Sequence, residues 1–270
     1  MSSPRAPAIF ISHGAPTELI QQGPWQTTMD GIGREVKPRA VIVMSAHWRS
    51  QGGFDVGYQP TFETLHDFSG FPEELSKFKY PANGDLDLAE QCVSLLKGAA
   101  YNSSLDRARG LDHGVYVPLH HMWKRADVPV IPVGISSKAT PRDVFRAGEI
   151  LAPLRNEGVM MIGSGGMVHN LGALTWGNPS NDKPDPWAAE FQKWVFDALE
   201  DRDFAALCDF REHAPHAKEA HPTWEHFAPL LFTAGAASAW GEQMEELYSG
   251  WAFGCLSMSC IGYGKIFRDS

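Results

Sequence analysis

The sequence has few cysteines, no long apolar run and no block of charge of one sign. Its four cysteines show no C-x-x-C spacing, so they indicate neither a disulfide framework nor a zinc ribbon, and we expect core thiols. No apolar stretch approaches the roughly 20 residues that span a bilayer, and residues 1–7 lack the apolar core of a signal peptide. We therefore expect no membrane contact and a cytoplasmic location.

Several common catalytic and nucleotide-binding motifs are also missing. There is no complete G-x-G-x-x-G, no P-loop lysine, no G-x-S-x-G and no H-E-x-x-H, which argues against nucleotide binding, ordinary serine hydrolysis and metalloprotease chemistry. Lys and Arg total 23 against 32 for Asp and Glu, a formal net charge of −9. An acidic chain without basic clusters is not expected to bind nucleic acid.

What the sequence does contain is typical of one α/β domain over residues 1–270. Hydrophobic residues make up 43% of the chain, enough for a large interior. Short apolar runs that end at turn residues predict buried strands, and apolar residues at helical spacing predict helices between and after them. We expect a mainly parallel central sheet, mixed at its edge, with helices on both faces. The predicted strands are 8–12, 40–46, 128–135 and 159–163, and the predicted helices are 84–100, 140–156 and 185–200.

Three local features refine this picture. Thr140, Pro141 and Asp143 predict a capped helix start. The alternating segment 251–263 predicts a last strand, antiparallel at an edge of the sheet. Residues 178–186 (NPSNDKPDP) predict a loop.

The strongest functional signal comes from five of the 11 histidines in the chain. His13 and His47 each follow a predicted strand, and the carboxyl ends of parallel strands meet at one edge of a sheet. A lone histidine at a strand end is more often a core or capping residue than a metal ligand. Two histidines in matching places make the structural and the metal-binding interpretations about equally probable. Neutral imidazole is a common ligand of Fe(II) and Zn(II). Three further histidines lie in comparable glycine-rich or turn contexts: His113, His169 and His221.

Other histidines and glycines have simpler interpretations. His213 and His216 flank Pro215 beside charged residues, so we expect them on the surface. The pair 120–121 is expected on a helix after a proline. The glycines of 163–166 indicate backbone that passes close to a metal pocket rather than a phosphate cradle.

Six motifs together resemble the class III extradiol ring-cleaving dioxygenases, in the DOPA 4,5-dioxygenase branch of the LigB-like superfamily. They span nearly the whole chain: ISHGAPT, VIVMSAHW, LHDFSGFPEEL with KYPANG, RGLDHGVYVPL, IGSGGMVHNL and AHPTWEHFAPLL. The resemblance implies that His13, His47 and His221 bind a metal. It also implies that His169 is a further ligand or an acid/base, and that His113 hydrogen-bonds substrate or oxygen.

The resemblance further implies a reaction and its cofactor. A catechol and O2 would meet at Fe(II), and the ring would open beside the diol, with His169 and His113 as the catalytic acid/base residues. Zn(II), native or adventitious, also suits an all-nitrogen ligand set. The protocatechuate branch uses two histidines and a glutamate instead. Aromatic residues near the motifs could form the walls of a substrate pocket: Trp48, Phe68, Phe71, Tyr116 and Trp224. His66 and Asp67 could lie at its rim.

Three alternatives stay open on the sequence alone. The chain could cleave an aminophenol, act as a zinc-dependent hydrolase, or be a catalytically silent, Memo-like metal-binding protein. The sequence does not identify the phenolic substrate, and it leaves room for a homodimer.

Overall fold

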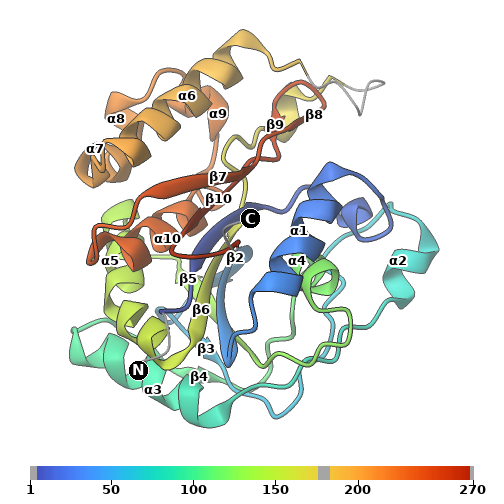
Figure 1. Ribbon diagram of the computed structural model, residues 1–270, viewed down its shortest axis with the longest axis vertical. Coiled ribbons are helices and arrows are strands. Elements are labelled where there is room, and N and C mark those ends of the chain that lie inside the picture. Colours follow the sequence, from blue (N-terminus) through green and yellow to red (C-terminus); the bar gives the residue numbers. More distant parts are fainter. Residues whose placement is uncertain (1–4, 176–182, 268–270) are drawn as a thin grey trace.

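The centre of the chain is a mixed sheet, seen in a computed structural model that describes residues 5–175 and 183–267 (Figure 1). The strands are β1 (Ala8–Ser12), β2 (Ala40–Ser50), β3 (Val56–Gly57), β4 (Leu105–Asp106), β5 (Val130–Ser136), β6 (Val159–Gly165), β7 (Met244–Tyr248), β8 (Trp251–Ala252), β9 (Leu256–Ser257) and β10 (Cys260–Tyr263). Eight of them form one sheet in the order β4-β3-β5-β2-β6-β1-β10-β7. The four central strands, β5, β2, β6 and β1, are parallel, whereas β10 and β7 extend the sheet antiparallel.

Helices cover both faces of this sheet (Figure 1). The α-helices are α1 (Pro24–Glu35), α2 (Glu73–Lys77), α3 (Leu86–Gly98), α4 (His113–Met122), α5 (Pro141–Leu151), α6 (Pro186–Glu200), α7 (Phe204–Cys208), α8 (Phe210–His213), α9 (Ala217–Ala220) and α10 (Ala228–Ser238). Three 3-10 helices join them: η1 (Pro16–Leu19), η2 (Ala152–Glu157) and η3 (Leu171–Ala173).

Successive strand residues enter two separate cores, because side chains alternate across a sheet. In β2, Ile42 and Met44 belong to the core that α3, α5 and α10 cover. Val41 and Val43 belong to the other core, under α1 and α4. Burial on both faces explains why these strands read as continuous apolar runs. The α/β fold with a mainly parallel sheet is confirmed.

The predicted helix 140–156 shows how local signals set boundaries. Thr140 accepts a hydrogen bond from the Asp143 backbone while the Asp143 side chain accepts one from the Thr140 backbone, which completes a capping box. The α-helix ends at Leu151, and the chain continues as the 3-10 helix η2. Pro153 has no N–H to donate to the carbonyl four residues earlier, so the α-helical ladder cannot continue through it.

The prediction of one last strand over 251–263 is wrong in its extent. Phe253 and Gly254 both have positive φ, so the chain turns there and makes the small β8–β9 hairpin. Only β10 joins the main sheet, antiparallel to β1, and β7 rather than the last strand occupies the edge. The alternation of apolar residues continues through this turn, so the sequence pattern does not reveal it.

Other expectations concern the cysteines, the loop and the membrane. All four cysteines are buried free thiols, as predicted. The loop predicted over 178–186 lies mostly outside the described residues, and α6 begins at its last residue, Pro186. Among the described helices, none is both long and apolar enough to cross a bilayer.

Candidate metal centre

The two strand-end histidines come together as predicted, on either side of β6. His13 follows β1 directly, while His47 lies within β2, which continues past its predicted end to Ser50. The pairing of β2 with β5 is irregular between Met44 and Arg49, so His47 sits where the regular ladder is interrupted. The two rings are 5.0 Å apart between centroids, and their Nε2 atoms are 3.1 Å apart.

Ser164, on the strand between them, fixes the proton of His13. Pro118 lies inside α4 and has no N–H, so the carbonyl of Gly114 lacks its usual helical donor. The Ser164 hydroxyl donates to that carbonyl. The same Oγ is 2.9 Å from His13 Nδ1, and because its hydrogen is already committed, it accepts from Nδ1–H. His13 Nε2 therefore carries a lone pair.

The Asp67 carboxylate contacts both His47 and His113. Its carboxylate oxygens lie 2.9 and 3.0 Å from His113 Nδ1, 3.1 Å from the His113 backbone nitrogen and 3.4 Å from His47 Nδ1. Burial would raise the pKa of Asp67, but hydrogen bonds and charge from His113, with a contribution from His47, lower it to about 2. An ionised carboxylate can only accept, so His113 Nδ1 donates to it, and its charge 3.4 Å from His47 Nδ1 favours the tautomer in which that nitrogen carries the hydrogen and Nε2 the lone pair.

These protonation states fit a divalent cation. The potential ligand atoms of His13, His47 and His113 all lie within 4.8 Å of one another. Burial, with smaller contributions from neighbouring histidines, lowers the pKa of His13 well below its usual value, and burial with the charge of His113 lowers that of His47 to about 4. The His13 and His47 rings are therefore neutral at pH 7. Two facing lone pairs at 3.1 Å repel each other unless a cation lies between them, and neutral imidazole is a ligand of Fe(II) and Zn(II).

A fourth ring, His226, packs beside His13 and His47, and the sequence did not predict it. Its centroid is 5.0 Å from that of His47 and 5.6 Å from that of His13. The Gly166 N–H donates to the His226 carbonyl at 2.9 Å, and a Cβ on Gly165 would lie 2.2 Å from that oxygen. The predicted close backbone approach at these glycines is thus confirmed, and it places the His226 segment. A second histidine in the motif AHPTWEHF was the available signal.

His221, predicted as a metal ligand, is placed elsewhere. Its ring packs among Phe191, Phe210 and Phe227 at centroid distances of 5.5, 6.1 and 5.1 Å, and its Nε2 lies 2.9 Å from the carbonyl oxygen of Met167. Within the described part of the chain, it has no ring contact with His13 or His47. The turn after α9 directs this side chain into the apolar core, so the expected convergence of His221 with the strand-end histidines is not found.

His169 lies beside the cluster rather than in its donor group. Its ring stacks on that of His226, with centroids 3.5 Å apart and planes 2° apart. Burial, followed by the charge of His47, lowers the pKa of His169 to about 4, so the ring is neutral at pH 7 and can accept a proton. This position suits an acid/base next to a metal.

Of the five predicted aromatic wall residues, Phe68 lies near the histidines with Phe71 packed against it, and the other three lie elsewhere. The Phe68 ring is 5.9 Å from that of His113. Tyr116 is fully buried in the core beside Phe78, and its hydroxyl has no partner among the described residues. Trp48 is buried under the Arg109 guanidinium. Trp224 packs against the main core and makes no ring contact with the site histidines in the part that the structure describes.

The remaining histidines behave as expected. His213 and His216 are exposed, and α8 ends before Pro215. The 120–121 pair lies in α4, after Pro118. His66 Nε2 lies 3.0 Å from the Phe78 carbonyl oxygen, which holds the segment that carries Asp67.

Comparisons with known proteins give the same picture. Residues 7–255 match the family described as the catalytic LigB subunit of aromatic ring-opening dioxygenase. The chain is 36% identical to a protein of Beta vulgaris named 4,5-DOPA dioxygenase extradiol, over 92% of each chain. It is 35% identical to a protein of the same name from Escherichia coli K12, over 98% of this chain and 97% of that one.

A solved structure matches as well. The crystal structure of an uncharacterized protein from Escherichia coli K12 superimposes with a TM-score of 0.81 at 32% identity, covering 96% of this chain and 99% of the other. Matches of this extent in sequence and fold, together with a histidine centre that fits a metal, show that the chain belongs to the LigB family of aromatic ring-opening dioxygenases.

Proposed function

We propose that this protein opens the ring of a catechol with dioxygen, beside the diol, at a divalent metal held by His13, His47 and His226. The observation that carries the proposal is the approach of the His13 and His47 Nε2 atoms to 3.1 Å. Relatives named 4,5-DOPA dioxygenase extradiol support a DOPA-like or other substituted catechol as the substrate.

The choice of the third ligand depends on where the substrate ring can lie. His113 and His226 each contact both His13 and His47 but not each other, so they flank the pair separately. Phe68 packs against His113, and Phe71 packs against Phe68, which makes this the side with an aromatic wall. We therefore assign His113 to the substrate and His226 to the metal.

Fe(II) is the metal that we propose. It would bind the catechol and dioxygen together and let electrons pass from the catechol to dioxygen. The chain's own residues do the rest. His169, neutral at pH 7, accepts a proton from a catechol hydroxyl. His113, held in place by Asp67, hydrogen-bonds the other hydroxyl through its Nε2 atom. The protonated His169 can then return its proton to the product.

Buried, unpaired thiols support the cytoplasmic location that we propose, since a reducing compartment keeps cysteines in this form. Substrate and dioxygen are both small, and neither needs a further protein partner in this scheme.

The reaction can be tested by loading the protein with Fe(II) without air and then adding catechol and oxygen. We expect one O2 consumed per catechol and a yellow ring-opened product, with neither from His13→Ala. Oxygen uptake with aminophenols only would contradict the catechol assignment. Bound metal without any oxygen uptake would contradict the dioxygenase function and favour a hydrolase or a silent metal-binding protein.

A further inference from the structure

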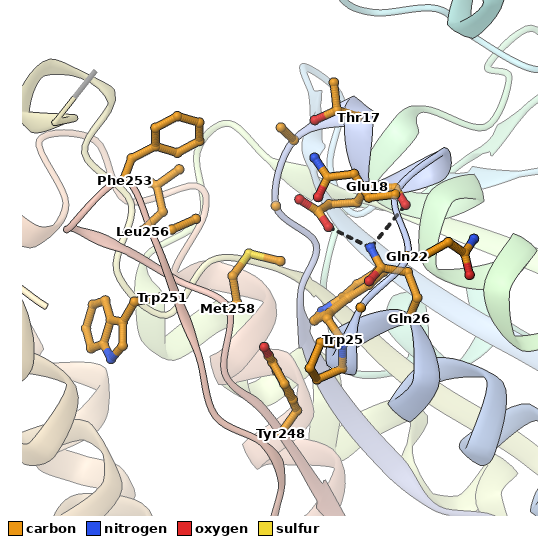
Figure 2. A pocket seen from close by; sticks show the side chains of 16 residues that line it. Thr17, Glu18, Gln22, Trp25, Gln26, Tyr248, Trp251, Phe253, Leu256 and Met258 are labelled. Carbon is orange, nitrogen blue, oxygen red and sulfur yellow. Dashed lines mark hydrogen bonds between the residues drawn. The ribbon is translucent and has the colours of Figure 1, made fainter. Parts of the chain in front are cut away.

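A second cavity lies directly beside the metal centre and has no role in the reaction described above. It has a volume of about 390 Å³, within the range of small-molecule sites. One wall comes from η1 and the start of α1, with Glu18 and Trp25, and the other from the β8–β9 region, with Trp251 and Met258 (Figure 2). Tyr248, at the end of β7, closes it from below in this view.

This cavity is joined to the metal centre through shared walls. Gly14, Leu256 and Met258 line it and also line a small cavity that touches His13 and His169. Gly14 has a φ of +67°, and a Cβ there would lie 2.8 Å from Met258 Cε and 2.9 Å from Glu18 Cγ. A residue with a side chain would therefore not fit between the two cavities. Met258, unbranched and adaptable, is the movable part of this wall.

The cavity contains an acidic group that lacks a charged partner. Glu18 accepts a hydrogen bond from Gln26 Nε2 at 2.8 Å, but none of the ion pairs among residues 5–175 and 183–267 involves it. Burial raises the pKa of Glu18, and the bond from Gln26 only partly offsets this. The ionised carboxylate is costly to desolvate here, and a cation in the cavity would compensate for that cost.

The rest of the lining indicates which cation would fit. Trp25 donates its indole N–H to the backbone of Ser12, so its polar group is already satisfied and only its ring is available. Tyr248 adds a second ring. Aromatic faces attract organic cations and flat apolar bodies, whereas a metal ion would need several more oxygen ligands than one carboxylate supplies.

We propose that Glu18 binds the ammonium group of an amine-bearing aromatic ligand and so selects catechols that carry such a side chain. The selection of substrates rests on the proposed ring cleavage, but the binding of the amine does not. Glu18 would be a specificity residue, with Trp25 and Tyr248 against the apolar part of the side chain and Met258 between this part and the reacting ring.

Tyramine is a suitable probe of binding, because it has the ammonium group but lacks the second hydroxyl that chelates a metal. Its affinity for the metal-free protein can be followed by tryptophan fluorescence. We expect Glu18→Gln to weaken binding about tenfold or more, as for loss of a charge-assisted hydrogen bond. Glu18→Asp, which keeps the charge, should retain most of it. Glu245→Gln removes an exposed charge from β7 outside the cavity and should change nothing.

The Fe(II)-loaded enzyme gives an independent reading. The ratio of kcat/KM for dopamine to that for 4-methylcatechol should fall about tenfold in Glu18→Gln and stay unchanged in Glu245→Gln. Tyramine that fails to bind, or that binds Glu18→Gln as tightly as the wild type, would overturn the proposal whatever the activity. If no catechol is cleaved while tyramine binding still depends on Glu18, the proposed reaction fails and the amine site stands.

Discussion

At the scale of single residues, the centre depends on the acceptors that orient its rings. Ser164 accepts the Nδ1–H of His13, and Asp67 accepts that of His113 and lies 3.4 Å from His47 Nδ1. The potential ligand atoms of the three rings lie within 4.8 Å of one another. Acceptors of this kind set the tautomer and the orientation of metal-binding imidazoles. Asp67, which the sequence placed only at a pocket rim, is thereby a positioning residue for two histidines at once.

Replacing Asp67 with Asn should weaken metal binding about 10- to 100-fold, in line with the effect of such partners in other metal sites. The amide is uncharged, and its NH2 group cannot accept a hydrogen, so one of the two carboxylate oxygens that contact the His113 and His47 rings is lost as an acceptor. Competition with a chromophoric chelator measures the affinity. Asp197→Asn, which removes a charge from the exposed face of α6, is the matched control. Equal affinities in the two variants would remove Asp67 from this role.

The sequence could predict His13 and His47 because each is tied to the end of a recognisable strand. It predicted His221 rather than His226 from the motif AHPTWEHF, since both lie in similar turns before α10, and the structure places His226 beside His13 and His47. Only packing separates them: His221 faces three phenylalanines, whereas His226 is directed to the cluster by contact with the end of β6. No local pattern carries this difference.

At the scale of elements, three neighbouring strands hold the centre. β1 and β2 present His13 and His47, and β6 between them presents Ser164 and then closes on the His226 backbone at Gly165. The parallel strands could be predicted because burial on both faces gives them continuous apolar runs. The short C-terminal strands could not, because the turn at Phe253 and Gly254 interrupts an alternation that otherwise persists.

Gly165→Ala should therefore damage the metal site without touching any ligand. The added Cβ would lie 2.2 Å from the His226 carbonyl oxygen, so the segment that carries His226 must move away from β6. We expect metal affinity to fall at least tenfold, which is the lower end of the range for losing a contact that orients a metal ligand. Gly98→Ala is the control, since a Cβ there meets nothing within 4 Å. Unchanged affinity in Gly165→Ala would show that this contact does not place His226.

At the scale of the whole molecule, the buried histidines make the metal-free fold sensitive to mild acid. Burial, with lesser effects of neighbouring charges, lowers the folded-state pKa to about 4 for His47 and His169 and to about 3 for His221 and His226. In the unfolded chain each is near 6.5. The unfolded state therefore binds more protons below pH 6.5, and stability that is complete above that value falls as the pH drops toward the folded pKa values.

At pH 5 this difference amounts to about 2 kcal/mol for each deeply buried histidine, such as His221. Urea unfolding of the metal-free protein at pH 7 and pH 5 should show a loss of several kcal/mol. Asp67 and Glu225 have folded-state pKa values of about 2, so their contribution to the free energy of unfolding is lost only below pH 5. They therefore do not affect the comparison between pH 7 and pH 5. Equal free energies of unfolding at the two pH values would contradict the neutral, buried state of these rings.

The most direct test of the account is the metal content of four purified proteins loaded with Fe(II) under the same anaerobic conditions. We predict close to one metal ion per chain in the wild type, in His113→Ala and in His221→Phe, and almost none in His226→Ala. Metal lost from His221→Phe or His113→Ala but fully retained by His226→Ala would contradict the proposed convergence of His13, His47 and His226 on one ion.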